Sequence, residues 1–123
     1  MATPVHANNR AVHVIDATER PLGRIATQVA TLLMGKNKAS FTPNTDRGDF
    51  VHVKNAAKIR LTGKKEEQKV YKWYTGFQGG LRSRKISVVK EKNPGEMLER
   101  AVKNMLPKNT HQTPRLRRLR VTN

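Results

Sequence analysis

The sequence predicts an α/β fold, and three segments of its first half carry that prediction. Residues 11–15 (AVHVI) form a short apolar run that is typical of a buried strand. Residues 22–33 place apolar side chains at the i, i+3, i+4, i+7 spacing of one helical face. Residues 50–53 (FVHV) form a second short apolar run. A strand, a helix and a strand in this order predict a right-handed βαβ unit.

The predicted helix over residues 22–33 has recognisable boundaries. Pro21 stands where proline is favoured at a helix start, and Gly35 stands where glycine is favoured at a helix stop. We interpret Gly23, in the first turn, as a residue that allows close packing between the helix and the sheet. The segment from Asp16 to Pro21 ends the first strand, and residues 36–49 are polar and rich in turn-forming residues.

The segments between residues 56 and 92 have weaker patterns. Residues 56–61 (AAKIRL) predict one helical turn that leads into a short strand, and residues 64–69 predict a charged loop. Residues 70–74 (VYKWY) alternate in the manner of a strand. Residues 83–92 predict a short helix.

A second long helix is predicted to begin after residue 92. Asn93 is placed as its N-cap, Pro94 lies in its first turn, and Glu96 occupies the capping-box position. Pro107 ends the helix. Its apolar stripe consists of Met97, Leu98, Ala101, Val102 and Met105.

The charge of the chain is strongly positive and unevenly distributed. With 25 Lys and Arg against 9 Asp and Glu, the formal net charge is +16. Residues 1–53 hold six basic and four acidic side chains, whereas residues 54–107 hold fourteen and five, and residues 108–123 hold five and none. The excess charge therefore belongs to the second half of the chain, where it can bind a polyanion.

Several classes of protein are excluded by composition. Cysteine is absent, so the chain has no disulfide, no thiolate nucleophile and no Cys-containing zinc site, which fits a reducing compartment. No apolar run approaches the ~20 residues of a membrane span, and the first residues lack a secretory signal. We expect an intracellular protein that does not enter a membrane.

The sequence contains none of the common enzyme motifs that we considered. The sequence has no Gly-x-Ser-x-Gly elbow and no His-Glu-x-x-His zinc pair. A phosphate-binding loop needs glycine five residues before Gly-Lys, but those positions hold Lys58 and Ala30. Only the Pro21–Arg24 turn is placed like a mononucleotide-binding loop, and its single glycine falls short of that motif.

Isolated polar residues favour structural roles. His13 and His52 lie inside predicted strands, where a hydrogen-bonded packed imidazole is more common than a metal ligand. Asp46 and Asp49 bracket Gly48, and their spacing favours Asx-type turns over a metal site.

The segment from residue 64 to residue 85 is the main candidate RNA-binding site. Glycines let backbone amides approach phosphate, cations neutralise it, and aromatic rings can stack on unpaired bases. For Trp73, packing within the fold is a better interpretation than RNA contact, because it occupies an alternate position with Tyr71 on a predicted strand. The predicted contacts are Lys64, Lys65, Lys69, Lys72, Tyr74, Gly76, Gly79, Gly80, Arg82, Arg84 and Lys85.

The C-terminal segment is the densest basic cluster. Thr113-Pro114 predicts the start of one or two helical turns (RLRRLR), in which Leu116 and Leu119 share a face. The alternatives are a solvated tail and an anionic membrane surface, although two leucines make a small apolar face. The predicted RNA contacts here are Arg115, Arg117, Arg118 and Arg120, joined elsewhere by Lys36, Lys38 and Lys108.

Three motifs resemble one known family. They are TPNTDRGDFVHVKNAAKIRLTG (42–63), YTGFQGG (74–80) and AVKNMLPKN (101–109). Together they are similar to the large-subunit ribosomal protein thirteen family over residues 11–109. Two departures stand out: Phe77-Gln78 precede the paired glycines where the family usually has a proline, and THQTPRLRRLR replaces the usual segment after residue 109.

The resemblance implies an α/β fold in three layers, with a mainly parallel central sheet flanked by helices, plus basic loops and a basic C-terminal extension. We expect an N-terminal extension (1–10), a single RNA-binding domain (11–109) and the C-terminal extension (110–123).

The resemblance also implies a function. It implies a non-catalytic structural constituent of the large ribosomal subunit that binds and stabilises large-subunit ribosomal RNA. Such a protein contacts neighbouring large-subunit proteins and acts early in subunit assembly, on a cytoplasmic or organellar ribosome. No cofactor, metal, membrane or small-molecule substrate is expected. The alternative that the residues leave open is a small α/β nucleotide-binding enzyme or regulator.

Overall fold

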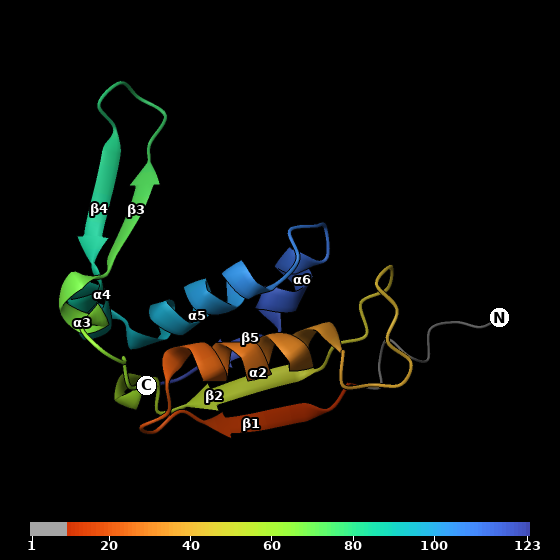
Figure 1. The fold of residues 1–123 in the computed structure, drawn as a ribbon. Coiled ribbons are helices and arrows are strands. Elements are labelled where there is room, and N and C mark those ends of the chain that lie inside the picture. The colour runs from red at the N-terminus through yellow and green to blue at the C-terminus, as the bar shows by residue number, and fades with distance from the viewer. Residues whose placement is uncertain (1–9) are drawn as a thin grey trace.

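A parallel sheet organises the fold (Figure 1). The computed structural model describes residues 10–123. The central strand β2 (Phe50–Lys54) pairs in parallel with both of its neighbours, so that Val53 lies beside Ile15 on one side and Val121 on the other. The predicted α/β class with a parallel sheet and flanking helices is confirmed. In spatial order the strands are β1 (Val12–Asp16), β2 (Phe50–Lys54) and β5 (Leu119–Val121).

Helix α2 (Leu22–Met34) connects β1 to β2, as the sequence predicts. It begins after Pro21 and ends at Gly35, which adopts a left-handed conformation (φ 81°) and donates its N–H to Thr31 O. The interpretation of Gly23 is wrong, because a Cβ atom added there would meet no atom within 4 Å. Gly23 therefore imposes no close approach on the helix.

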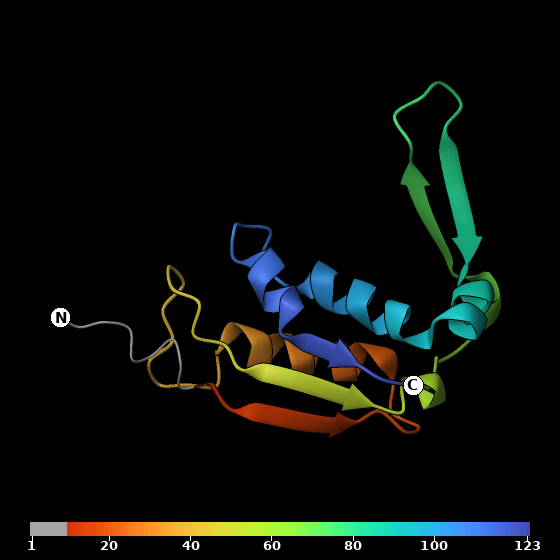
Figure 2. The same ribbon diagram turned by 180° about the vertical axis from the view of Figure 1, so that it is seen from behind.

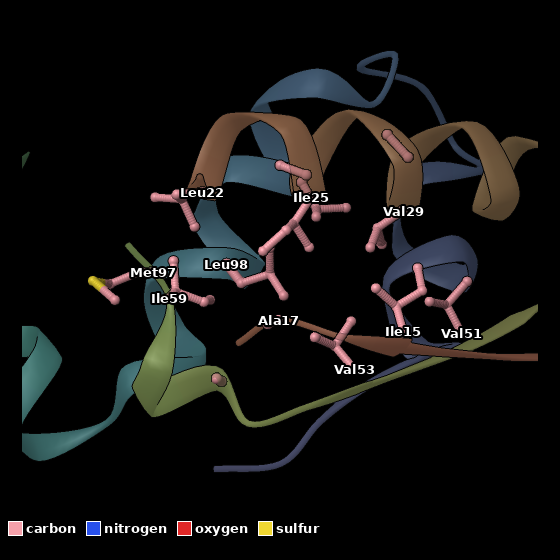
Figure 3. Packing of buried hydrophobic residues seen from close by; sticks show 14 of the residues in the cluster. Ile15, Ala17, Leu22, Ile25, Val29, Val51, Val53, Ile59, Met97 and Leu98 are labelled. Atoms are coloured by element: carbon pink, nitrogen blue, oxygen red, sulfur yellow. The ribbon is translucent and has the colours of Figure 1, made fainter. Parts of the chain in front are cut away.

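The hydrophobic core lies between the sheet and two helices, α2 and α5 (Pro94–Met105) (Figure 3). Each fully buried aliphatic side chain contributes about 1.5–3 kcal/mol relative to exposure. Along β1 and β2 one face is buried and the other exposed, since Val12, Val14 and Phe50 are largely accessible. The central core side chains are Ile15, Ile25, Val29, Leu33, Val51, Val53, Met97, Leu98 and Val102.

Helix α5 differs from its prediction in its capping hydrogen bonds and in the exposure of Met105. Asn93 makes no side-chain cap, and the Glu96 carboxylate instead accepts hydrogen bonds from Arg100 one turn later (2.9 and 2.6 Å). Asn93 occupies the predicted N-cap position, but the capping box is therefore wrong. Met105 is 42% exposed, so it does not belong to the buried stripe. Pro94 in the first turn and the end of the helix before Pro107 are confirmed.

The segment after β2 contains short elements. The predicted helical turn is present as η1 (Ala56–Lys58), and Arg60 then forms an isolated parallel bridge with Pro21 in place of a strand. The predicted charged loop contains the single-turn helix α3 (Lys65–Gln68). None of the side chains of α3 is buried.

An antiparallel hairpin projects from the domain (Figures 1 and 2). It consists of β3 (Val70–Tyr74) and β4 (Leu81–Lys85), and we call residues 70–85 the β3–β4 arm. The strand at residues 70–74 is confirmed. The predicted helix over residues 83–92 is wrong for residues 83–85, which pair with β3, and helix α4 begins later (Ile86–Lys92).

The C-terminal segment is part of the fold. The predicted basic helix stops early, because α6 spans Gln112–Arg117 and Leu119 lies in β5. Leu116 and Leu119 therefore do not share a helical face, although both pack against the core. The sheet includes residues beyond 109, where we predicted the domain to end. The predicted N-terminal extension lies outside the described residues, except for Arg10.

Candidate nucleic-acid interface

The β3–β4 arm carries cations and aromatic rings on one face. Residues directly opposite in an antiparallel pair share a face. Trp73 lies opposite Arg82, and Tyr71 lies opposite Arg84. The Arg84 guanidinium also stands 5.7 Å from the centre of the Trp73 ring. Trp73 is still 40% exposed, so the predicted packing role accounts for only part of its surface.

The opposite face of the arm is also accessible. Tyr74 lies opposite Leu81, and they are 62% and 64% exposed. Lys72 and Lys85 are exposed on the same face, since they pair with Ser83 and Val70 respectively. Between Glu67 and Glu91 the chain has no carboxylate side chain, so nothing on the arm neutralises these cations.

The glycines at the tip of the arm shape the turn. Gly80 is buried, and its N–H donates to Phe77 O (2.9 Å). A Cβ atom at Gly80 would lie 2.1 Å from Thr75 Oγ1 and 2.8 Å from Phe77 O, so only glycine fits. Gly76 and Gly79 are exposed, and Phe77 between them is 78% exposed. Gly80 is thus a turn residue, and its predicted RNA contact has no accessible surface in support.

Three predicted lysines lie at the foot of the arm. Lys64 and Lys69 flank helix α3, Lys65 is its first residue, and all three are exposed. Lys69 directly precedes β3, and its Nζ stands 5.5 Å from the centre of the Tyr71 ring. The structure therefore brings seven of the predicted cations together, in the arm and at its foot.

Two arginines that the sequence did not single out lie beside this foot. Arg24 in α2 and Arg60 after η1 line one hollow with Lys65 and Lys69. They are far apart in the sequence, and their segments are brought together by the bridge between Pro21 and Arg60 and by the hydrogen bond from Glu19 N–H to Lys58 O (2.9 Å). No local motif could have predicted this pairing.

The other predicted cations lie elsewhere. Lys36 follows α2, and the helix separates it by about 20 Å, at 1.5 Å per residue, from the foot of the arm. Lys36 and Lys108 are exposed. Lys38 is an ion-pair partner of Asp49, with Nζ 2.7 Å from Asp49 Oδ1, and is therefore less available to an external anion.

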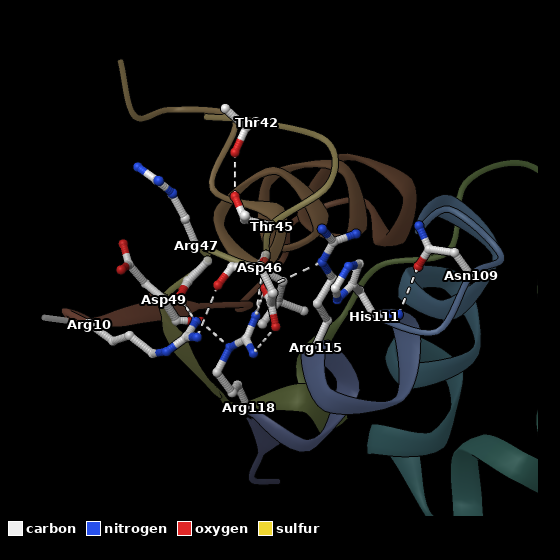
Figure 4. A network of polar contacts seen from close by, with 12 residues as sticks. Arg10, Thr42, Thr45, Asp46, Arg47, Asp49, Asn109, His111, Arg115 and Arg118 are labelled. Carbon is white, nitrogen blue, oxygen red and sulfur yellow. Dashed lines mark hydrogen bonds and ion pairs between the residues drawn. The ribbon is translucent and has the colours of Figure 1, made fainter. Parts of the chain in front are cut away.

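The arginines of the C-terminal cluster divide into two largely buried and two exposed side chains, and Figure 4 shows the largely buried pair, Arg115 and Arg118, beside Asp46. Arg115 is 2% exposed, and the Arg118 side chain is 9% exposed. Both contact Asp46: Arg118 donates from Nη1 and Nη2 to the two carboxylate oxygens (2.6 and 2.7 Å), and Arg115 Nε lies 3.5 Å from Oδ1. Arg117 and Arg120 are exposed. Arg115 and Arg118 form internal ion pairs with Asp46, which leave little of their surface accessible for the predicted RNA contact.

Arg118 joins three segments of the chain. Besides Asp46, its Nη2 donates to Leu33 O at the end of α2 (2.9 Å), and its Nε donates to Asp49 O (3.4 Å). Arg10 also donates to Asp46 O (3.0 Å) and to Gly48 O. We call Asp46, Arg115 and Arg118 the Asp46 clamp, because it holds α6 against the loop before β2.

The fold stabilises the charged carboxylates of Asp46 and Asp49. Burial alone would raise the pKa of Asp46, but the hydrogen bond and charge of Arg118 outweigh it and lower the pKa below its usual 3.8. A backbone hydrogen bond from Gly48 acts in the same direction, in keeping with the predicted local turn. For Asp49, burial is again outweighed, by Lys38 and His13, and its pKa is lowered.

The predicted roles of the histidines are confirmed. His13 Nε2 lies 2.8 Å from Asp49 Oδ2, and His52 Nε2 lies 3.2 Å from Thr122 Oγ1. Among residues 10–123 no group of three His, Asp or Glu side chains is placed to hold a metal ion. In the same part of the chain, no helix has the length and apolar character needed to cross a bilayer.

Comparison with known proteins places this fold in a family. A family model described as ribosomal protein L13 matches residues 10–122. The chain belongs to the ribosomal protein L13 family. L13 family members are structural proteins rather than enzymes, so the enzyme alternative is wrong.

Three relatives of the L13 family illustrate the similarity, and each is named large ribosomal subunit protein uL13. The protein of Oenococcus oeni is 51% identical over 105 residues, which are 85% of this chain and 71% of the relative. The protein of Halorhodospira halophila is 49% identical over 109 residues, 89% of this chain and 77% of the relative. The protein of Rubrobacter xylanophilus is 48% identical over 112 residues, 91% and 78% of the two chains.

The three L13-like motifs have distinct places in the structure. The motif at 74–80 forms the tip of the β3–β4 arm. The motif at 42–63 holds Asp46, all of β2 and Arg60, whereas the motif at 101–109 spans the end of α5. The three motifs therefore include the tip of the arm, Asp46 of the clamp and the central strand.

Proposed function

We propose that this chain is a structural constituent of the large ribosomal subunit that binds large-subunit ribosomal RNA through the β3–β4 arm and its foot. The three relatives described above are named as large-subunit proteins, which supports the first part of the proposal. The RNA-binding part rests on one observation: the arm presents arginines and exposed aromatic rings side by side, with no carboxylate.

The chemistry of the arm suits folded RNA. The major groove of an RNA helix is too narrow for side chains, so structured RNA is recognised through its shape, phosphates and 2′-hydroxyls. The planar guanidinium groups of Arg82 and Arg84 match phosphate geometry, and the rings of Trp73, Tyr74 and Phe77 can stack on unpaired bases. An exposed hairpin can reach such features where a flat surface cannot.

Exposed cations away from the arm would extend the contact. Lys36, Lys108, Arg117 and Arg120 remain accessible and are proposed as secondary contacts. Neighbouring large-subunit proteins are proposed as further partners, and we propose that the protein joins the subunit early in its assembly. In a reconstitution from purified components, early assembly predicts stable binding to ribosomal RNA before most other proteins are added.

The direct test reverses the charge of the arm. In the variant Arg82→Glu/Arg84→Glu/Lys85→Glu, three phosphate contacts are lost, and the slope of log K against log salt should fall by roughly 2–3. The measurement is a filter-binding titration with transcribed large-subunit ribosomal RNA at several salt concentrations. Circular dichroism should show an unchanged fold, because all three side chains are exposed.

A matched control separates position from total charge. The variant Lys54→Glu/Lys92→Glu/Lys103→Glu changes the net charge by the same amount at exposed sites away from the arm. Its affinity should remain much closer to that of the unmodified protein. Equal salt titrations of the two triple variants would remove the arm from the interface, and a wild-type complex insensitive to salt would contradict RNA-phosphate binding altogether.

A further inference from the structure

A basic hollow of about 670 Å³ lies at the foot of the β3–β4 arm. Its walls come from the start of α2, the segment after η1, helix α3 with Lys69, and the last turns of α5. The size is within the ~300–1,000 Å³ range of sites that hold small ligands. Its lining includes Arg24, Arg60, Leu61, Lys65, Lys69 and Met105.

The charge of the hollow is positive and unopposed. Four cations line it, and no Asp or Glu does. Within residues 10–123, Arg24, Arg60 and Lys65 form no ion pair with any other side chain. The nearby carboxylate of Glu66 is bound by Lys90 Nζ (2.9 Å) on another helix. The hollow therefore attracts an anion that the domain itself does not supply.

The walls also contain apolar surface. Leu22, Leu61 and Met105 line the hollow, and Met105 is the one residue of the predicted α5 stripe that is largely exposed. Its exposure has an explanation here, since it faces the hollow beside Thr27, whose Oγ1 lies 3.6 Å from its sulfur. A ligand with a phosphate and a planar or sugar portion matches both kinds of wall.

A second hollow lies beside the first. A neighbouring hollow of about 450 Å³ shares Thr62, Lys65 and Lys69 with the first and adds Lys64. Lys69 is directly followed by β3, so the two hollows adjoin the arm. Successive basic hollows suit the successive phosphates of a polymer better than one free nucleotide.

From this arrangement we infer that the foot of the arm is an RNA-backbone groove, in which Arg24 and Arg60 bind phosphates of the strand that the arm contacts. The inference rests on the proposed function and adds two binding residues to it. A Gly-rich phosphate loop is not needed, because the four cations come from three separate segments. The same chemistry would recognise a free nucleotide, which the test below distinguishes.

The test removes the two arginine charges and keeps the fold. Arg24→Gln/Arg60→Gln should raise Kd for transcribed large-subunit ribosomal RNA about tenfold at moderate salt and lower the salt slope by about 1.5. Lys54→Gln/Lys92→Gln removes the same charge elsewhere and should change both quantities much less. A second variant, Gly23→Gln, adds an uncharged side chain to the wall of the hollow where a Cβ meets nothing within 4 Å. It should also weaken binding.

The outcomes separate this inference from the proposed function. If the wild-type protein binds the RNA but the Arg24→Gln/Arg60→Gln variant matches its Lys54→Gln/Lys92→Gln control, the groove is wrong and the arm is unaffected. Saturable binding of ATP that Arg24→Gln/Arg60→Gln abolishes, with RNA affinity unchanged, would assign the hollow to a mononucleotide and also overturn the inference. Failure of the wild-type protein to bind RNA would overturn the proposed function itself.

Discussion

Removing the carboxylate of the Asp46 clamp should destabilise the whole domain. In Asp46→Asn, Arg118 loses two short charged contacts and Arg115 loses its only anion among the described residues. Breaking a buried ion pair by removing one partner costs about 3–5 kcal/mol, because a charge stays buried without compensation. Arg118 keeps Leu33 O and Asp49 O as acceptors, so we expect the lower end, about 3 kcal/mol.

Urea and thermal unfolding at pH 7 measure this cost. At about 2.1 cal/mol/K of unfolding entropy per residue, a loss of 3 kcal/mol lowers the melting temperature of a domain of this size by roughly 12 °C. The control is Glu66→Gln, which removes the exposed ion pair with Lys90 and should cost less than about 1 kcal/mol. If Asp46→Asn unfolds within 1 kcal/mol of the wild type, the clamp does not hold α6.

The pH dependence has a definite sign. The pKa of Asp46 is lower in the folded protein than the usual 3.8, so its contribution to stability is complete above about pH 4. That contribution disappears as the pH falls further and the carboxylate is protonated. The stability difference between wild type and Asp46→Asn should therefore shrink below pH 4. A difference that stays constant down to pH 2 would contradict the assignment.

Two other predictions concern local geometry. Gly48→Ala should destabilise the fold by about 3 kcal/mol or more, because the new Cβ would lie 1.6 Å from Leu33 O, whereas Gly23→Ala should stabilise it by about 0.4–1 kcal/mol. Chemical denaturation of the pair measures both, and similar values for the two variants would contradict the packing described. The pKa of Asp16 should be about 2, held down first by the Thr18 hydroxyl and then by Asn55. Carbon-13 titration should show it rising toward 3.8 in Thr18→Ala, and no change would exclude that hydrogen bond.

The elements with a strong local pattern were predictable from the sequence. In α2 the apolar spacing, Pro21 and Gly35 all agree with the buried face and the left-handed end of the helix. β2 was equally clear, since a short apolar run between polar segments fits a central strand. These predictions succeed because the forces that decide them act within a few residues.

Elements decided by distant partners were not predictable. Residues 83–85 resemble a helix start locally, but they form a strand because β3 supplies the backbone partners. Arg115 and Arg118 contribute to the densest basic cluster, yet they contact Asp46 69 and 72 residues away. Their three-residue spacing, which puts them on one face of a helical turn, was the available signal. The high positive charge of the cluster favoured RNA binding for all four arginines, so the internal role of these two was not predicted.

The β3–β4 arm lies mostly outside the core, against which Tyr71 at its base packs, and this affects its dynamics. Within residues 70–85 only Gly80 is buried, and an isolated two-stranded hairpin is marginally stable in water. Amides of the arm should therefore exchange with solvent far faster than those of β2, where Val51 and Val53 are buried. If the arm becomes ordered when RNA binds, the entropic cost of ordering it reduces the observed affinity. A substitution that preorganises the hairpin without contacting RNA should therefore strengthen binding.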